Sequence, residues 1–249
     1  MATLNPSDIE AIERATIAAV SPVAIEEGDG WLMAFDTGTV GRAKSAVPLR
    51  HAICDAAAAQ KIEVRYAARG LPALFRLADH PSFESLKKEL TYRGYRAGRP
   101  TLVQIAAARA VREVFPDASA DVAAAPDAAW AAVFLGEGFD PVDGASRVKA
   151  LSRSPGSVYA SVRESGRAIA AGAAAFGYGW ASVHGMRTDQ ARRGEGLAAR
   201  VLAALAAVAL ERRMERMFLQ VEKDNASALA LYRRAGFETA WEYAYWQRA

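Results

Sequence analysis

Cysteine and histidine are scarce in this chain, and neither is clustered. Cys54 is the only cysteine, which excludes an internal disulfide bond. It lies in the apolar, alanine-rich stretch 52–59, where a buried structural thiol is more common than a nucleophile. The first half of the chain has no cluster of metal-ligating residue types. We therefore expect no metal cofactor.

A long hydrophobic run is also missing. The most apolar window, residues 197–210, is too short to span a bilayer and is flanked by arginines at both ends. The chain start, Met1 to Pro6, has no basic segment followed by an apolar one, which a secretion signal needs. These absences predict a soluble, cytoplasmic protein without a membrane partner.

No block of like charge occurs either. The 31 lysines and arginines barely outnumber the 28 aspartates and glutamates, and both signs are spread along the chain. This pattern does not indicate nucleic acid as a partner, although a mild basic excess suits a polyanionic cofactor. A hydrophobic fraction of 52% with 24% charged residues is typical of a folded globular chain and excludes extensive disorder.

Predicted strands alternate with predicted helices, which indicates an α/β fold with a mixed sheet. In the first half the pattern predicts a helix capped by Ser7 or Asp8, followed by helices at 51–61 and 83–90. It also predicts four strands: one at 31–35, a second that ends near residue 49, a third at 62–66 and a fourth at 73–77. In the second half it predicts helices at 127–135, from 197 and at 226–234, and strands at 158–163, 168–178, 181–188, 217–222 and 237–246.

The stretch 115–126 has the alanine- and proline-rich composition of a linker, so we expect domains 1–120 and 121–249. The two halves share a helix–glycine–aromatic pattern, around Gly94 in the first and Gly236 in the second. We interpret the first domain as a degenerate copy of the second, although such a pattern is also common in unrelated chains. In the first copy Leu90 stands where the second has Tyr232, so we expect no second active site.

The strongest local signal is a strand followed by Arg193-Gly194-Glu195-Gly196-Leu197-Ala198 and a helix. A helix start presents free backbone N–H groups and a positive dipole end, and glycines let a phosphate approach those amides closely. The loop lacks both the Lys-Ser/Thr ending of nucleotide-hydrolysing loops and the spacing of the dinucleotide fingerprint. A plain surface turn with two glycines is the alternative for this loop alone.

A second pattern follows downstream, from Asn225 through Ala228, Tyr232 and Gly236 to Phe237. By itself it fits a capped helix with a core aromatic residue. In this order and spacing, the two patterns together resemble the GNAT superfamily of N-acetyltransferases over about half the chain. The resemblance implies the acyl-CoA N-acyltransferase fold, with a degenerate copy in tandem, and acetyl-CoA as co-substrate.

The resemblance also implies a role for each matched residue. Amides of the loop and the helix start should bind the CoA pyrophosphate; the residues are Arg193, Gly194, Glu195, Gly196, Leu197, Ala198 and Ala199. Main-chain groups of Met186 and Thr188 should hold the pantetheine arm and the thioester carbonyl. Asn225 should contact the pantetheine, and Tyr232 should protonate the leaving thiolate as general acid.

The proton acceptor stays open. The strand position that carries a catalytic glutamate in ribosomal-protein alanine acetyltransferases is Gln220 here, and the position used by histone-type members is nearest Trp180. His184 and Glu222 are the remaining candidates, each with a structural role as the alternative. Water, acting on an already neutral amine, is the third route.

We therefore expect an N-acetyltransferase that moves an acetyl group to a primary amine by direct attack on the thioester. A non-catalytic acyl-CoA-binding sensor or interaction module is the alternative. The acceptor is a small-molecule or peptide amine, and the chain forms a monomer or a homodimer. The first domain either shapes the acceptor side of the site or only stabilises the second. The terminal aromatics Trp241, Tyr243, Tyr245 and Trp246 either line that side or pack in the sheet.

Overall fold

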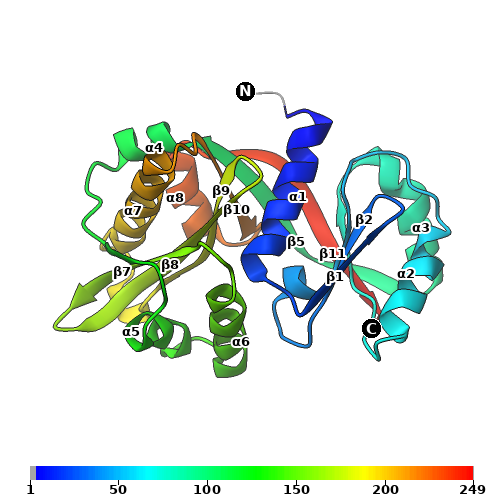
Figure 1. Cartoon of the computed structure of the whole chain (residues 1–249), viewed down its shortest axis with the longest axis horizontal. Coiled ribbons are helices and arrows are strands. Elements are labelled where there is room, and N and C mark those ends of the chain that lie inside the picture. Colours follow the sequence, from blue (N-terminus) through cyan, green and yellow to red (C-terminus); the bar gives the residue numbers. More distant parts are fainter. Residues whose placement is uncertain (1–3, 249) are drawn as a thin grey trace.

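The computed structural model describes residues 4–248. Met1 to Thr3, on which the expectation about the chain start partly rests, lie outside the described residues. Figure 1 shows two lobes, with the long strands β5 and β11 running between them and α1 lying against both. The described strands form a single mixed sheet in the order β1-β2-β3-β4-β11-β5-β10-β9-β8-β7-β6.

The strands are β1 (Ala24–Gly28), β2 (Trp31–Phe35), β3 (Ala46–Pro48), β4 (Phe75–Ala78), β5 (Tyr95–Ala107), β6 (Asp121–Ala123), β7 (Val158–Glu164), β8 (Arg167–Gly177), β9 (Trp180–Thr188), β10 (Arg216–Glu222) and β11 (Glu238–Arg248). The α-helices are α1 (Pro6–Val20), α2 (Ala58–Ala67), α3 (Glu84–Tyr92), α4 (Ala108–Val114), α5 (Ala128–Ala132), α6 (Pro141–Ser152), α7 (Leu197–Glu211) and α8 (Ala226–Arg234). Short 3-10 turns are η1 (Gly41–Lys44), η2 (Pro81–Phe83), η3 (Val133–Leu135) and η4 (Gln190–Arg192).

The two halves repeat one order of elements. In the first, β2–β3 is antiparallel, β3 runs parallel to β4 through α2, and α3 leads into β5. In the second, β8–β9 is antiparallel, β9 runs parallel to β10 through α7, and α8 leads into β11. The repeated order is what the interpretation of the first half as a copy of the second requires.

The halves also exchange their last strands. β5 lies between β10 and β11 and pairs antiparallel with both, while β11 lies between β4 and β5. Each half therefore completes its sheet with a strand from the other half. A boundary near residue 120 stays a prediction, because the sheet crosses it without interruption.

Helix α1 links the two halves on one face of the sheet. Its Glu13 forms a buried ion pair with Arg76 of β4, and its Thr16 accepts a 2.8 Å hydrogen bond from Gln220 of β10. Burial raises the pKa of the Glu13 carboxyl. Removal of one partner of a buried ion pair strongly destabilises a protein, because it leaves the other charge buried and unpaired. These contacts therefore fix the position of α1 on the sheet.

Helix α7 packs on the opposite face, and its periodic apolar residues produce that packing. Leu197, Val201 and Leu205 lie about one turn apart and are buried against β7, β8 and β9 in the largest core cluster. Helix α4 packs beside α7. The result is a rigid strand–helix unit, β9–α7, of the kind that the sequence predicts.

Several predicted elements are wrong or shifted. Residues 62–66 form part of α2 rather than a strand, since Ile62 and Tyr66 share one buried helix face. The cap of α1 is Asn5, with Asp8 at the third helical position in a capping box. Helix α6 and most of β5 were not predicted. Within residues 4–248 no helix is both long enough and apolar enough to cross a bilayer.

Candidate active site

The candidate site lies where two parallel strands separate. β9 and β10 pair only through three residues, of which Val183 opposite Leu219 is the last. Beyond that pair the strands diverge, and a cleft of about 780 Å³ opens between their carboxyl-terminal ends. The cleft is lined by β9, β10, the loop before α7, and α8. Loss of pairing at this point exposes backbone groups of both strands to the cleft.

A bulge in β9 faces the cleft. Ala171 and Ala173 of β8 pair with Arg187 and His184, so two residues of β9 lie opposite one of β8. The first of these two, Gly185, has φ +61°, and a Cβ there would lie 2.7 Å from the Leu151 side chain. Glycine is therefore required at this position on both counts. The bulge leaves main-chain groups beside Met186 outside the regular ladder.

The loop before α7 has the geometry of an anion site. Gly196 caps the helix in the left-handed conformation, at φ +78°, and no side chain bonds to the first-turn amides. A Cβ at Gly194 or Gly196 would meet no described atom within 4 Å. The N-terminal amides of a fifteen-residue helix therefore open onto free space in the cleft.

Loop charge is divided between a paired and an unpaired arginine. Arg192 bonds to Glu195 at 2.7 Å and to Glu164 at 2.6 Å. Arg193 has no carboxylate within 4.0 Å among the described residues, and its guanidinium lies 5.9 Å from the ring centre of Phe139. Of the residues predicted for the loop, Glu195 alone does not line the cleft, because it points outward to Arg192.

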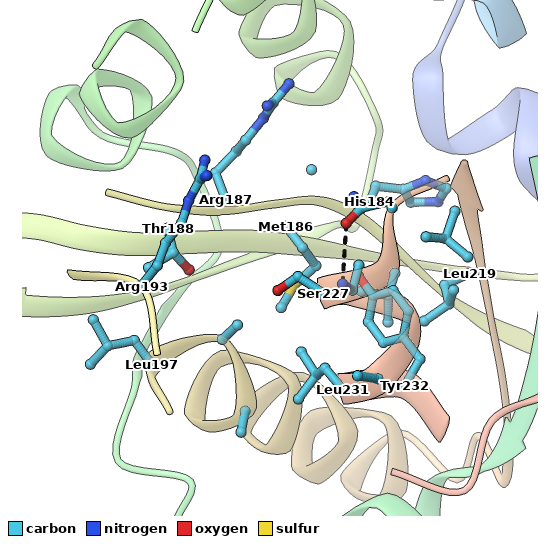
Figure 2. A pocket seen from close by; sticks show the side chains of 18 of the residues that line it. His184, Met186, Arg187, Thr188, Arg193, Leu197, Leu219, Ser227, Leu231 and Tyr232 are labelled. Atoms are coloured by element: carbon cyan, nitrogen blue, oxygen red, sulfur yellow. Dashed lines mark hydrogen bonds between the residues drawn. The ribbon is translucent and has the colours of Figure 1, made fainter. Parts of the chain in front are cut away.

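Residues of the second pattern lie on the other wall. Asn225 caps α8 through a 3.1 Å bond from the Ala228 amide to its Oδ1, and it also lines the cleft. Tyr232 is only 6% exposed, and burial raises the pKa of its phenol to about 12. At neutral pH this hydroxyl is a proton donor and not a phenolate. Figure 2 shows Tyr232 and Leu231 facing β9 across the cleft, with Met186 pointing toward them.

Comparisons with known proteins agree with this geometry. Residues 6–246 match the model of a family described as "Probable histone acetyltransferase Rv0428c C-terminal". The chain belongs to this family. No curated protein matches it. The GNAT resemblance of the two patterns is thus confirmed over nearly the whole chain.

Solved structures show the same fold. A GCN5-related N-acetyltransferase from Kribbella flavida has 18% identity and a TM-score of 0.68, over 96% of this chain and 95% of that one. One from Sphaerobacter thermophilus has 14% identity and a TM-score of 0.59, over 99% and 94%. A tandem GNAT protein from the clavulanic acid biosynthesis pathway has 12% identity and a TM-score of 0.60, over 96% and 86%. The predicted acyl-CoA N-acyltransferase fold is confirmed.

In this GNAT chain the two candidate proton acceptors have opposite environments. His184 is 3% exposed, and neither ring nitrogen has a hydrogen-bond partner among the described residues. Burial lowers its pKa well below the usual range, and the charge of Arg42 lowers it further. Glu222 lies exposed at the open end of β10. Both residues line the cleft.

Gln220, which the sequence excludes as a base, serves as a structural junction. Its Oε1 accepts a hydrogen bond from the Tyr243 hydroxyl at 2.9 Å, and its Nε2 donates to Thr16. The terminal aromatic residues do not line the cleft, and Tyr243 and Tyr245 are buried in the sheet.

The lining residues that the sequence does not identify include Arg42 of η1, Phe139 and Arg147 of α6. None belongs to either pattern, and Arg42 comes from the first half of the chain. No local signal distinguishes them, because they meet the cleft only through the tertiary fold. Among the described residues no group of acidic, histidine or cysteine side chains could hold a metal ion.

Proposed function

We propose that this protein is an acetyl-CoA-dependent N-acetyltransferase whose acceptor is a primary amine. The observation that carries the proposal is that the start of α7, whose amides bond to no side-chain cap, and the buried Tyr232 line one cleft. One feature suits a pyrophosphate and the other suits a thiolate leaving group. Acetyl-CoA supplies both, together with a thioester that an amine can attack directly.

The residues present fit this co-substrate. Leu197 and Ala198 would offer first-turn amides to the pyrophosphate, and Gly196 leaves the space that a phosphate needs. The diverging strands would hold the extended arm through main-chain groups of Met186 and Thr188. A main-chain N–H at the β9 bulge would stabilise negative charge on the thioester oxygen.

Two proton transfers complete the reaction. The amine nitrogen bonds to the carbonyl carbon and the carbon–sulfur bond breaks, so sulfur needs a proton and nitrogen must lose one. Tyr232 would donate its phenolic proton to the sulfur. Glu222, or a water that it orders, would take the proton from nitrogen, with His184 as the second candidate. The buried, neutral imidazole of His184 has a free lone pair, whereas Glu222 is already open to solvent.

Steady-state release of free CoA thiol with a panel of amines tests this function. Calorimetric binding of acetyl-CoA to the full chain provides the matched measurement. Binding with amine-dependent thiol release supports the enzyme. Binding without release from any amine would favour the sensor, the alternative that the missing glutamate at Gln220 leaves open. Absence of binding would contradict both.

A further inference from the structure

Arg42 brings an unneutralised positive charge to the narrow end of the cleft. It lies on η1, is partly buried, and lines the cleft. No carboxylate of residues 4–248 lies within 4.0 Å of its guanidinium. Among these residues its guanidinium approaches one side-chain oxygen, Oε1 of Gln220, at 3.5 Å. That oxygen already accepts the Tyr243 hydroxyl at 2.9 Å, so it satisfies Arg42 weakly.

The surroundings make this charge unfavourable without a partner. Burial lowers the pKa of the Arg42 guanidinium; Tyr243 and Tyr245 oppose this, and the nearby cations Arg147 and Arg76 add a smaller lowering effect. A partly buried cation without an anion is less favourable than one in water, and no carboxylate of residues 4–248 lies within salt-bridge distance of Arg42. An anionic ligand bound at Arg42 would remove that cost.

The carboxylate beside Arg147 and Arg187 is already engaged. Asp143 of α6 accepts hydrogen bonds from Arg147 at 2.6 Å and Thr39 at 2.7 Å, and its Oδ2 lies 3.6 Å from Arg187. These donors lower its pKa against the opposing effect of burial. Asp143 thus orients Arg147 and Arg187 but does not reach Arg42. Arg42, Arg147 and Arg187 therefore line this part of the cleft; Asp143 pairs with the last two, and Glu222 at the end of β10 also acts on Arg187.

Arg42 lies apart from the predicted pyrophosphate site. Arg42 contacts Gln220, and its charge lowers the pKa of His184. Gln220 and His184 each directly follow the last β9–β10 pair, Leu219 and Val183. The loop amides follow Thr188, at the far end of β9. Four residues of strand separate His184 from Thr188, roughly 13 Å at the usual rise. In Figure 2 Arg187 projects to the side of β9 opposite Met186 and α8. Its guanidinium and that of the loop residue Arg193 both approach the Phe139 ring, at 4.4 and 5.9 Å. Arg42 is therefore the arginine that we assign to the acceptor side.

We propose that the acceptor is a primary amine that also carries an oxyanion, a carboxylate or a phosphate, and that Arg42 with Arg147 binds this group. The inference rests on the proposed acetyl transfer. The planar fork of an arginine suits a bidentate contact with either oxyanion. Anchoring the oxyanion at Arg42 places the amine of the same small molecule beside the diverging strands. A lysine-rich peptide would instead bring cations against three arginines.

Paired acceptors test the inference on the full-length protein. Each pair shares one amine: amino acids with their amides, and phosphoethanolamine with ethanolamine; a lysine-rich peptide is added. We expect kcat/KM to favour the anionic member by at least about tenfold. Whether the carboxylate or the phosphate pair shows the larger preference identifies the oxyanion. Equal or better use of the neutral members and the peptide would overturn this inference and leave the acetyltransferase intact. Absence of transfer to every amine would overturn both.

Variants of Arg42 locate the effect. Arg42→Met should raise KM for the anionic acceptor at least about tenfold while KM for acetyl-CoA stays unchanged. Arg42→Lys, which keeps the charge and loses the fork, should fall between. Arg50→Met is the control, because Arg50 is exposed and does not line the cleft. Unchanged acceptor KM in both Arg42 variants would contradict the assignment. If Arg42→Met does not fold, Arg42→Lys and the wild-type preference still decide it.

Discussion

Replacing Gly196 with alanine separates the phosphate site from simple backbone strain. The residue has φ +78°, so a side chain there costs about 1–2 kcal/mol of folding free energy. A Cβ would meet no described atom within 4 Å, so protein packing adds nothing to that cost. Gly166, in the β7–β8 turn, is a matched control with φ +81° and the same open surroundings. The two variants should therefore lose similar stability in urea denaturation.

Only the variant at Gly196 should lose affinity. Its new Cβ would occupy the space through which a phosphate reaches the first amides of α7. We expect acetyl-CoA to bind at least about tenfold more weakly, equivalent to about 1.4 kcal/mol, in calorimetric titration. Gly166→Ala should bind as the wild type does. An unchanged dissociation constant for Gly196→Ala, at equal loss of stability, would refute the assignment of the loop as the pyrophosphate site.

Four further predictions follow from the same geometry. Tyr232→Phe should lower kcat by about 10²–10⁴ with acetyl-CoA affinity intact, because it removes only a proton donor; a wild-type rate would make the hydroxyl structural. Glu222→Gln should flatten the rise of rate with pH, and loss of rate in His184→Ala alone would transfer the role. Burial holds the pKa of His184 below its unfolded value of about 6.5, so the folded state binds fewer protons and stability should fall as pH drops through 6.5. The urea-derived free energy of His184→Asn should fall less steeply there than that of the wild type, and equal slopes would contradict this. Deletion of residues 1–120 removes β5 from between β10 and β11, so the remainder should aggregate; a soluble fragment that binds acetyl-CoA normally would show that the exchanged strand is dispensable.

Misjudged elements show where the sequence alone misleads. Residues 62–66 alternate apolar and charged side chains, as a half-buried strand does, but Ile62 and Tyr66 lie four apart and share the buried face of a helix. So short a segment does not distinguish a strand from a helix. The start of helix α6, in contrast, has a recognisable sequence signal, because Asp140 is the N-cap and Pro141 occupies the first helical position.

Strand β5 had no such signal. Its early residues, from Arg96 to Pro100, are exposed and include Gly98 and Pro100, so strand propensity is low. It is a strand because β11 pairs with it from residue 95 to residue 105 on one side and β10 pairs with residues 101–107 on the other. Pairing with neighbouring strands therefore overrides the low strand propensity of these residues.

The cofactor side of the candidate site could be read from the sequence. Left-handed Gly196 and the cap at Asn225 depend on backbone geometry within a few residues of each motif, so order and spacing were enough to indicate them. The acceptor side depended on the tertiary structure. Arg42 lies 178 positions from Gln220, and only the packing of η1 and α1 against the diverging strands brings the two together. The proposed role of Arg42 depends on its partial burial and on the absence of a carboxylate partner among the described residues. Neither property can be predicted from the local sequence around it.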